Sequence, residues 1–134
     1  MRVLLDTSAL VALMDADDPA HESVAAAWAT ILAEAVPPLL TSLTLLEALA
    51  VLPRRLGMDA VRVFCERHLP LIELHAVETP VLLTAVDAWL AARRRDLSLV
   101  DVVSFLVMRR EGLTQVFTID PHFTEQGFEC LPER

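Results

Sequence analysis

A chain of 134 residues has the length of one ordinary domain, and we expect a single domain over residues 1–134. The net charge of −8 argues against a surface that attracts nucleic acid as a whole, although all 11 cationic side chains are arginines and leave local contacts open. No run of about 18 apolar residues exists, and Asp6 interrupts the first apolar run, so we expect a cytoplasmic protein without a membrane span or export signal.

Short apolar runs alternate along the chain with longer helical patterns, which is typical of βαβ units and a parallel sheet. The pattern predicts strands at residues 2–6, 38–41, 71–74, 115–119 and 128–131. It predicts helices at residues 8–14, 20–35, 43–53, 58–68, 80–94 and 99–111, with Pro53 ending the third and Gly112 stopping the last. We therefore expect an α/β fold with a central, mainly parallel sheet of four to five strands flanked by helices. The pattern does not reveal the strand order.

Four acids stand where these elements meet. Asp6 closes the first strand, Glu47 follows the second strand, Asp101 opens a helix, and Asp120 closes the fourth strand. In an open α/β sheet the carboxyl ends of the strands gather at one edge, where ligands bind. Carboxylates collected at such an edge need a counter-charge, and a hard divalent cation supplies it.

Each acid also has a purely structural explanation. The two acids that close strands stand where a helix cap or a turn would need them. Glu47 with Thr44, and Asp101 with Ser98, have the spacing of a capping box. Four independent caps would not have to converge on one edge of the sheet, so the group as a whole favours a metal site.

The remaining acids and histidines give weaker signals. The acidic run at residues 15–18 lacks the glycine and terminal glutamate of a calcium-binding EF-hand loop, so we expect a solvated loop at the rim of the site. The four histidines show no zinc spacing. His122 lies two residues from Asp120, and we expect it to have a surface role.

Seven of the arginines form three clusters, at residues 54–55, 93–95 and 109–110. Arginine forks match the geometry of phosphate, but a positive charge in the last turn of a helix also complements the helix dipole. We favour the second role for residues 109–110, which directly precede Glu111 and Gly112, and leave the other two clusters open.

Competing chemistries lack their motifs in this sequence. There is no Gly-x-Gly-x-x-Gly after the first strand, no Walker-type phosphate loop and no Gly-x-Ser-x-Gly elbow. A phosphatase of the haloacid dehalogenase type has a second Asp two residues after the first, and Ser8 stands at that position.

Taken together, the motifs around the four acids resemble the PIN domain family, and within it the VapC-type toxins of bacterial toxin–antitoxin pairs. Their order and spacing match, and the resemblance covers essentially the whole chain. The matching segments are Leu4-Leu5-Asp6-Thr7-Ser8-Ala9-Leu10, Thr44-Leu45-Leu46-Glu47, Leu97-Ser98-Leu99-Val100-Asp101-Val102-Val103-Ser104-Phe105, Phe117-Thr118-Ile119-Asp120-Pro121-His122-Phe123 and Gly127-Phe128.

The resemblance implies a magnesium- or manganese-dependent endoribonuclease with a three-layer fold around the central sheet. It implies that the four acids form the catalytic metal site and that Thr7, Ser8 and Thr118 support it. Toxins of this type usually dimerise and are held inactive by a small antitoxin, so we expect a homodimer and a VapB-like partner. Two alternatives remain: a PIN ribonuclease that processes RNA without being a toxin, and a PIN-fold protein-binding module without activity.

The implied chemistry explains why four acids would be needed. Cleavage of a phosphodiester requires an activated water and relief of negative charge, and one or two Mg²⁺ ions supply both. Because Mg²⁺ takes only one or two carboxylates directly, we expect Asp6 and Asp101 as direct ligands. Asp120 and Glu47 would then orient water or hold a second ion. Without metal the carboxylates repel one another, so we expect at least one of them to have a raised pKa.

Overall fold

In the computed structural model, which describes residues 2–133, five short strands form one parallel sheet in the order β3-β2-β1-β4-β5. The central strand places Leu4 beside Leu39 on one side and Val116 on the other. This order was not predictable from the pattern, and it puts the first strand of the chain in the middle of the sheet. The strands are β1 (Val3–Leu5), β2 (Leu39–Thr41), β3 (Glu73–His75), β4 (Gln115–Phe117) and β5 (Glu129–Leu131).

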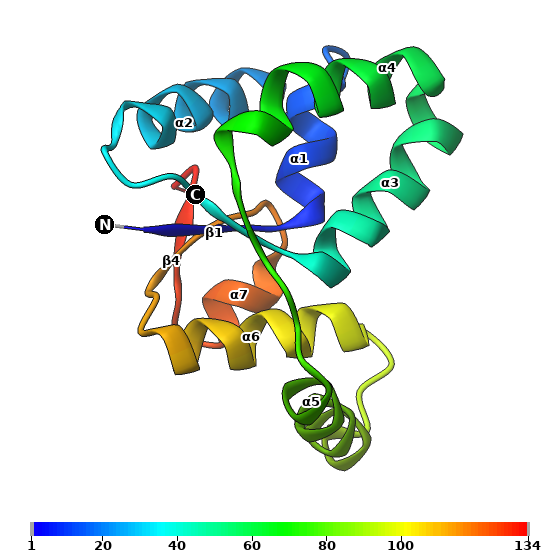
Figure 1. Cartoon of the computed structure of the whole chain (residues 1–134), viewed down its shortest axis with the longest axis vertical. Coiled ribbons are helices and arrows are strands. Elements are labelled where there is room, and N and C mark those ends of the chain that lie inside the picture. The colour runs from blue at the N-terminus through cyan, green and yellow to red at the C-terminus, as the bar shows by residue number, and fades with distance from the viewer. Residues whose placement is uncertain (1, 134) are drawn as a thin grey trace.

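Helices cover both faces of the sheet, which gives the expected three-layer sandwich. Figure 1 shows α1 to α4 on one side of the strands and α5 to α7 on the other. None of the helices described in residues 2–133 is long and apolar enough to cross a membrane. The helical elements are α1 (Thr7–Met14), α2 (His21–Ala33), α3 (Ser42–Leu56), α4 (Met58–Val63), the π-helical η1 (Phe64–His68), the 3-10 turn η2 (Leu69–Leu71), α5 (Thr79–Ala92), α6 (Leu99–Glu111) and α7 (Pro121–Glu125).

The apolar core is divided by the sheet into two clusters. Along β1, Val3 and Leu5 pack into the cluster formed with α1, α2 and α3, while Leu4 packs into the cluster formed with α5 and α6. All three residues are buried because both faces of a parallel sheet are covered, which is why β1 is continuously apolar. Burial of each such side chain stabilises the fold by about 1.5–3 kcal/mol, so the end of β1 is a firm base for Asp6.

The end of α3 corrects one expectation. We expected the helix to stop near Pro53, but it continues to Leu56 with the proline inside it. Pro53 lacks an N–H and costs one helical hydrogen bond, yet Leu52 beside it is fully buried and keeps this turn packed against the core. The helix ends instead at Gly57, whose φ of 86° favours glycine.

Three further differences concern short elements. The segment after Asp120, where a turn was the structural alternative, forms the short helix α7 with Pro121 at its first turn. The third strand begins at Glu73 rather than Leu71 because the residues before it form the turn η2. Only the first part of the predicted helix at 58–68 is α-helical, and the second part is the π-helical η1.

The carboxyl edge of the sheet is where the helices that matter for the site begin. β1 leads directly into α1, and β2 leads directly into α3. In Figure 1 the starts of α1, α3 and α6 come together at the end toward which β1 points. The residues at these starts therefore face one another across the edge of the sheet.

Candidate functional site

A cleft of about 500 Å³ opens at the carboxyl edge of the sheet. Asp6, Glu47, Asp101 and Asp120 all line it, although they come from four separate segments of the chain. The structure therefore brings together the four acids that the sequence singles out. The other residues that line the cleft are Thr7, Ser8, Val11, Asp18, Ala50, Val51, Arg54, Arg55, Ser98 and Ile119.

Asp6 occupies the floor of the site, with 3% of its surface exposed. Its backbone N–H donates to the carbonyl of Phe117 at 3.0 Å, which joins it to β4. Its Oδ2 accepts from the hydroxyls of Ser8 at 2.6 Å and Thr118 at 2.8 Å. Ser8 N–H also donates to this oxygen, at 3.4 Å, so that Asp6 caps α1. No described residue donates to the other carboxylate oxygen, Oδ1, which leaves it available to a cation.

The pKa of Asp6 is shifted strongly by these surroundings. Burial raises the pKa from 3.8 to about 6, because the charged form is removed from water. The hydroxyls of Ser8 and Thr118 act in the opposite direction, and the charges of Asp101 and Asp120 add to the rise. Repulsion between the acids, which we expected to be the cause, is therefore smaller than the effect of burial.

The two hydroxyls that hold Asp6 also hold the segment that carries Asp120. Ser8 Oγ accepts from the N–H of Ile119 at 3.0 Å, and Thr118 Oγ1 accepts from the N–H of Asp120 at 2.9 Å. Each hydroxyl gives its proton to Asp6 and uses its lone pairs for the backbone after β4. Ser8 and Thr118 thereby fix the positions of Asp6 and Asp120 relative to each other.

Glu47 is placed by α3 and held by Thr7. The hydroxyl of Thr7 donates to Glu47 Oε1 at 2.5 Å. The N-terminal cap of α3 is Thr41, whose hydroxyl accepts from the N–H of Thr44 at 3.1 Å. The possible capping box between Thr44 and Glu47 is therefore wrong: Glu47 lies beyond the first turn, and its side chain is directed to the cleft.

Asp101 caps a helix and also lies at the cleft. Its N–H donates to Ser98 Oγ at 3.0 Å and its Oδ2 accepts from the N–H of Ser98 at 3.3 Å, which completes the capping box of α6. The same carboxylate lines the cleft. Burial raises the pKa of Asp101, the hydrogen bonds from Ser98 lower it, and the charge of Asp120 contributes to the net rise.

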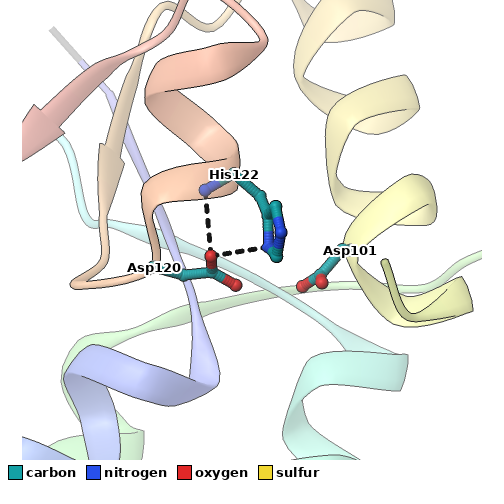
Figure 2. Close-up of side chains that lie close together, drawn as sticks. All are labelled: Asp101, Asp120 and His122. Atoms are coloured by element: carbon teal, nitrogen blue, oxygen red, sulfur yellow. Dashed lines mark hydrogen bonds and ion pairs between the residues drawn. The ribbon is translucent and has the colours of Figure 1, made fainter. Parts of the chain in front are cut away.

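Asp120 caps α7 and makes a second contact with the side chain of His122. Its Oδ1 accepts from the N–H of His122 at 2.9 Å. The imidazole Nδ1 lies 2.8 Å from the same oxygen, an ion-pair distance without hydrogen-bond alignment. The imidazole Nε2 lies 3.1 Å from Asp96 Oδ2. Figure 2 shows Asp101 facing Asp120 from α6, with the His122 ring beside the gap.

The structure places His122 among the acids, although we expected it to have a surface role. Burial lowers its pKa, but the hydrogen bond to Asp96 and the charge of Asp120 outweigh burial, so the pKa is raised. The sequence offers one indication of this position: His122 follows a helix-capping aspartate by two residues. At that spacing its N–H donates to the carboxylate of the cap, and its side chain lies close to Asp120.

The donor atoms in the cleft suit a hard divalent cation. One ligand atom each from Asp101, Asp120 and His122 lie within 4.8 Å of one another. Asp6 adds an oxygen that receives no hydrogen bond from the described residues, and Glu47 adds a further carboxylate in the same cleft. Mg²⁺ and Mn²⁺ prefer such oxygen-rich sets, and the imidazole is compatible with Mn²⁺.

The arginine clusters divide between the cleft and other surfaces. Arg54 and Arg55 line the cleft with the acids. Arg94 pairs with Asp96 and Glu125 outside it. Residues 93–95 line a separate hollow of about 300 Å³. For the third cluster, in the last turn of α6, the structure agrees with a structural role, because Arg109 donates to Gln126 and lies over the ring of Phe128.

Comparison with known proteins gives consistent matches over almost the whole chain. Residues 3–129 match the PIN domain family. The 23S rRNA-specific endonuclease VapC20 of Mycobacterium tuberculosis, from strains CDC 1551 and H37Rv, is 31% identical over 134 residues, covering 98% of this chain and 99% of the relative.

Solved structures agree with the sequence matches. The crystal structure of Mycobacterium tuberculosis VapC20, described as a sarcin-ricin loop cleaving toxin, superimposes with a TM-score of 0.83 at 26% identity and covers 94% of this chain and 95% of its own. FitAcB from Neisseria gonorrhoeae superimposes with a TM-score of 0.67 over 98% of this chain and 96% of its own. At 19% identity, this second likeness concerns the fold alone.

Proposed function

Because the chain belongs to the PIN domain family, we propose that it is a metal-dependent endoribonuclease of the VapC toxin type, acting as a single domain. The observation that carries this proposal is the convergence of Asp6, Glu47, Asp101 and Asp120 on one cleft from four separate segments. RNA is the substrate class. The VapC20 relative acts on 23S rRNA, so 23S rRNA is the first RNA to test.

The four acids of the cleft have distinct tasks in this proposal. Asp6, Asp101 and Asp120 would hold the cation, and Glu47 would complete the site from α3. Bound Mg²⁺ or Mn²⁺ would lower the pKa of a water molecule and relieve negative charge on the phosphate. Without such a cation the carboxylates would repel the phosphodiester, so we expect cleavage to require metal.

The supporting residues keep the acids in place. Ser8 and Thr118 hold Oδ2 of Asp6, so its free Oδ1 keeps a constant direction. Thr7 holds Glu47, and the His122 ring lies against the carboxylate of Asp120. Such supporting interactions orient metal ligands, and their removal commonly changes metal affinity by about 10–100-fold.

The proposed toxin needs a means of restraint in its own cell, and we include a small VapB-like antitoxin and a homodimer in the proposal. The antitoxin is supported by the likeness to VapC20, which is described as a toxin. Exposed apolar side chains such as Leu46, at 68% exposure beside Glu47, and Met58, at 68%, leave surface for protein contacts. Because the substrate is RNA, we place the protein in the cytoplasm.

The decisive experiment is cleavage of total cellular RNA by the purified protein with Mg²⁺, Mn²⁺ or EDTA. We expect discrete fragments that depend on metal and that are absent with Asp6→Asn and Asp101→Asn. Sequencing of the fragment ends would identify the cleaved RNA and the position of the cut. Both variants are purified in the same way as the wild type, so fragments that persist in them or in EDTA would reveal a contaminating nuclease.

Three outcomes separate the proposed toxin from its alternatives. Growth arrest on induced expression, relieved by co-expression of a small protein encoded beside it, supports the toxin. Metal-dependent cleavage without growth arrest would instead make the protein an RNA-processing ribonuclease. No cleavage by the folded protein with either metal would leave the protein-binding module.

A further inference from the structure

We propose that Arg54 and Arg55 bind the RNA backbone beside the bond that is cut, so that α3 carries both a site acid and the cations that position the substrate. This inference rests on the proposed function. It assigns the binding of substrate to one wall of the cleft, and it explains how an acidic protein holds a polyanion next to five carboxylates.

The helical spacing of α3 places the arginines on the same face as Glu47. Glu47, Ala50, Val51 and Arg54 follow one another at short helical intervals, and all of them line the cleft. With a rise of about 1.5 Å per residue, Arg54 lies about 10 Å along the helix from Glu47. That distance suits a phosphate that flanks the cleaved bond, not the cleaved phosphate itself.

The opposite wall runs beside α3 as far as the arginines. α1 contributes Ser8 and, one turn later, Val11 to the lining of the cleft. Beyond them, Arg55 Nη2 lies 3.8 Å from Asp15 Oδ2 at the end of α1. The cleft therefore has the four site acids at the sheet edge, and the arginines at the far end together with Asp18, whose N–H donates to the carbonyl of Asp15. Its middle is apolar, with Val11 opposite Ala50 and Val51, and a ribose or an unstacked base would fit there.

The two arginine side chains are not committed to strong partners. Arg54 donates through Nε to the carbonyl of Ala50 in its own helix at 3.1 Å, and no described residue forms a hydrogen bond or ion pair with its terminal nitrogens. Among the described residues, Arg55 has only the long contact to Asp15, and its side chain is 54% exposed. Exposed pairs of this kind contribute little, so both forks are free to bind phosphate. Arg94, by contrast, is held by two carboxylates.

The arginines also stand in the last turn of α3, where a positive charge complements the helix dipole. That role requires charge near the helix end but does not require the side chains to line the cleft. Among the described residues that line the cleft, Arg54 and Arg55 are the cations. They are therefore the groups in this cleft that can offset the repulsion between the carboxylates and an approaching RNA strand.

The test measures binding of a fluorescent RNA hairpin with a single-stranded loop by Asp6→Asn and by Asp6→Asn with Arg54→Ala and Arg55→Ala. Asp6→Asn with Arg62→Ala and Arg67→Ala is the control, because it also removes two positive charges, from exposed arginines that do not line the cleft. We expect the protein with Arg54 and Arg55 replaced to bind roughly tenfold more weakly or worse. The slope of log K against log salt should fall by about 0.7 for each RNA phosphate that the arginines no longer neutralise.

Cleavage by the otherwise unchanged enzyme provides the second measurement. Arg54→Ala with Arg55→Ala should raise KM and leave kcat nearly constant, since the arginines act in binding and not on the reacting atoms. Arg54→Lys with Arg55→Lys keeps the charge at the helix end but removes the planar fork, so we expect thermal stability like the wild type with a KM between the two.

The inference is overturned if the variant with Arg54 and Arg55 replaced binds RNA with the affinity and salt slope of the control with Arg62 and Arg67 replaced. A lower kcat at constant KM would also overturn it. Failure of the proposed function is distinguishable, because the wild type would then not cleave RNA with any metal while the binding comparison still decides the role of the arginines.

Discussion

The two oxygens of Asp6 have different surroundings, and this division is the most consequential detail at the scale of single residues. Oδ2 is saturated by donors from Ser8 and Thr118, while Oδ1 receives none from the described residues. The first oxygen ties the carboxylate into the fold, and the second remains for a ligand. His122 has a comparable double role, with Nδ1 near Asp120 and Nε2 near Asp96.

Asp6→Asn should stabilise the metal-free protein at pH 7. The folded-state pKa of about 6 lies above the ordinary 3.8, so the folded protein binds the proton more tightly, and the wild type becomes less stable as the pH rises from about 4 to 6. Asn keeps an acceptor for Ser8 and Thr118 but carries no charge. We expect a gain of up to about 3 kcal/mol in the free energy of unfolding above pH 6.

Urea unfolding of both proteins in EDTA between about pH 4 and 8 measures this difference. The two stability curves should meet near the ordinary pKa of 3.8 and be separated above the folded-state pKa of about 6. Parallel curves, or an Asn variant that is less stable at neutral pH, would mean that burial does not penalise the charge of Asp6.

His122→Ala should weaken metal binding while leaving α7 intact. The backbone N–H of residue 122 remains to donate to Asp120, so the helix cap survives, but no imidazole then lies against the Asp120 carboxylate. We expect Mn²⁺ affinity to fall by about tenfold, measured by isothermal titration calorimetry. His75→Ala, on β3 and outside the lining of the cleft, is the control. Unchanged affinity in the His122 variant would exclude it from the site.

At the scale of elements, the site is assembled from the starts of helices. Asp6 caps α1, Asp101 belongs to the capping box of α6, and Asp120 caps α7. The structural and functional explanations of these acids, treated as alternatives in the sequence, are therefore compatible. Glu47 differs because it lies inside α3 and depends on Thr7 for its position. The element that carries Glu47 also carries the arginines, so the integrity of α3 matters for both ends of the cleft.

Pro53→Ala tests how α3 tolerates its internal proline. Alanine restores an N–H that can bond within the helix and removes an unfavourable ring, and these gains exceed the cost of a more flexible unfolded chain. We expect the free energy of unfolding to rise by about 1–2 kcal/mol, measured by thermal and urea unfolding. A destabilised variant would show that packing of the proline ring contributes more than the missing hydrogen bond costs.

At the scale of the whole molecule, the strand order decides which acids can meet. β1 lies between β2 and β4, so Asp6 at the end of β1 is flanked by the segments that lead to Glu47 and Asp120. α6 then brings Asp101 to the same edge from the opposite layer. The two apolar clusters pack against β1 from both faces, so the acids converge on a rigid frame.

Metal should stabilise the whole fold, because the ligands come from both layers and from the middle of the sheet. A cation that binds only the folded state adds about 2.7 kcal/mol at a concentration roughly one hundred times its Kd. We expect the Tm to rise with Mn²⁺ or Mg²⁺ in the wild type and to change little in Asp6→Asn. An equal rise in the variant would place the cation outside the cleft.

The sequence by itself determined the alternation of strands and helices, the end of α6 at Gly112 and the four acids as a group, because apolar period, helix caps and glycine conformation are local properties. It did not predict that α3 continues through Pro53, because burial of Leu52 outweighs a missing hydrogen bond only in the packed protein. Nor did it place Asp96 against His122 or Arg54 in the cleft, since both depend on how distant segments pack together. Tertiary structure alone decided the strand order and the raised pKa of Asp6. It also decided that Glu47 and the two arginines of α3 line one cleft, because that depends on which elements pack beside the helix.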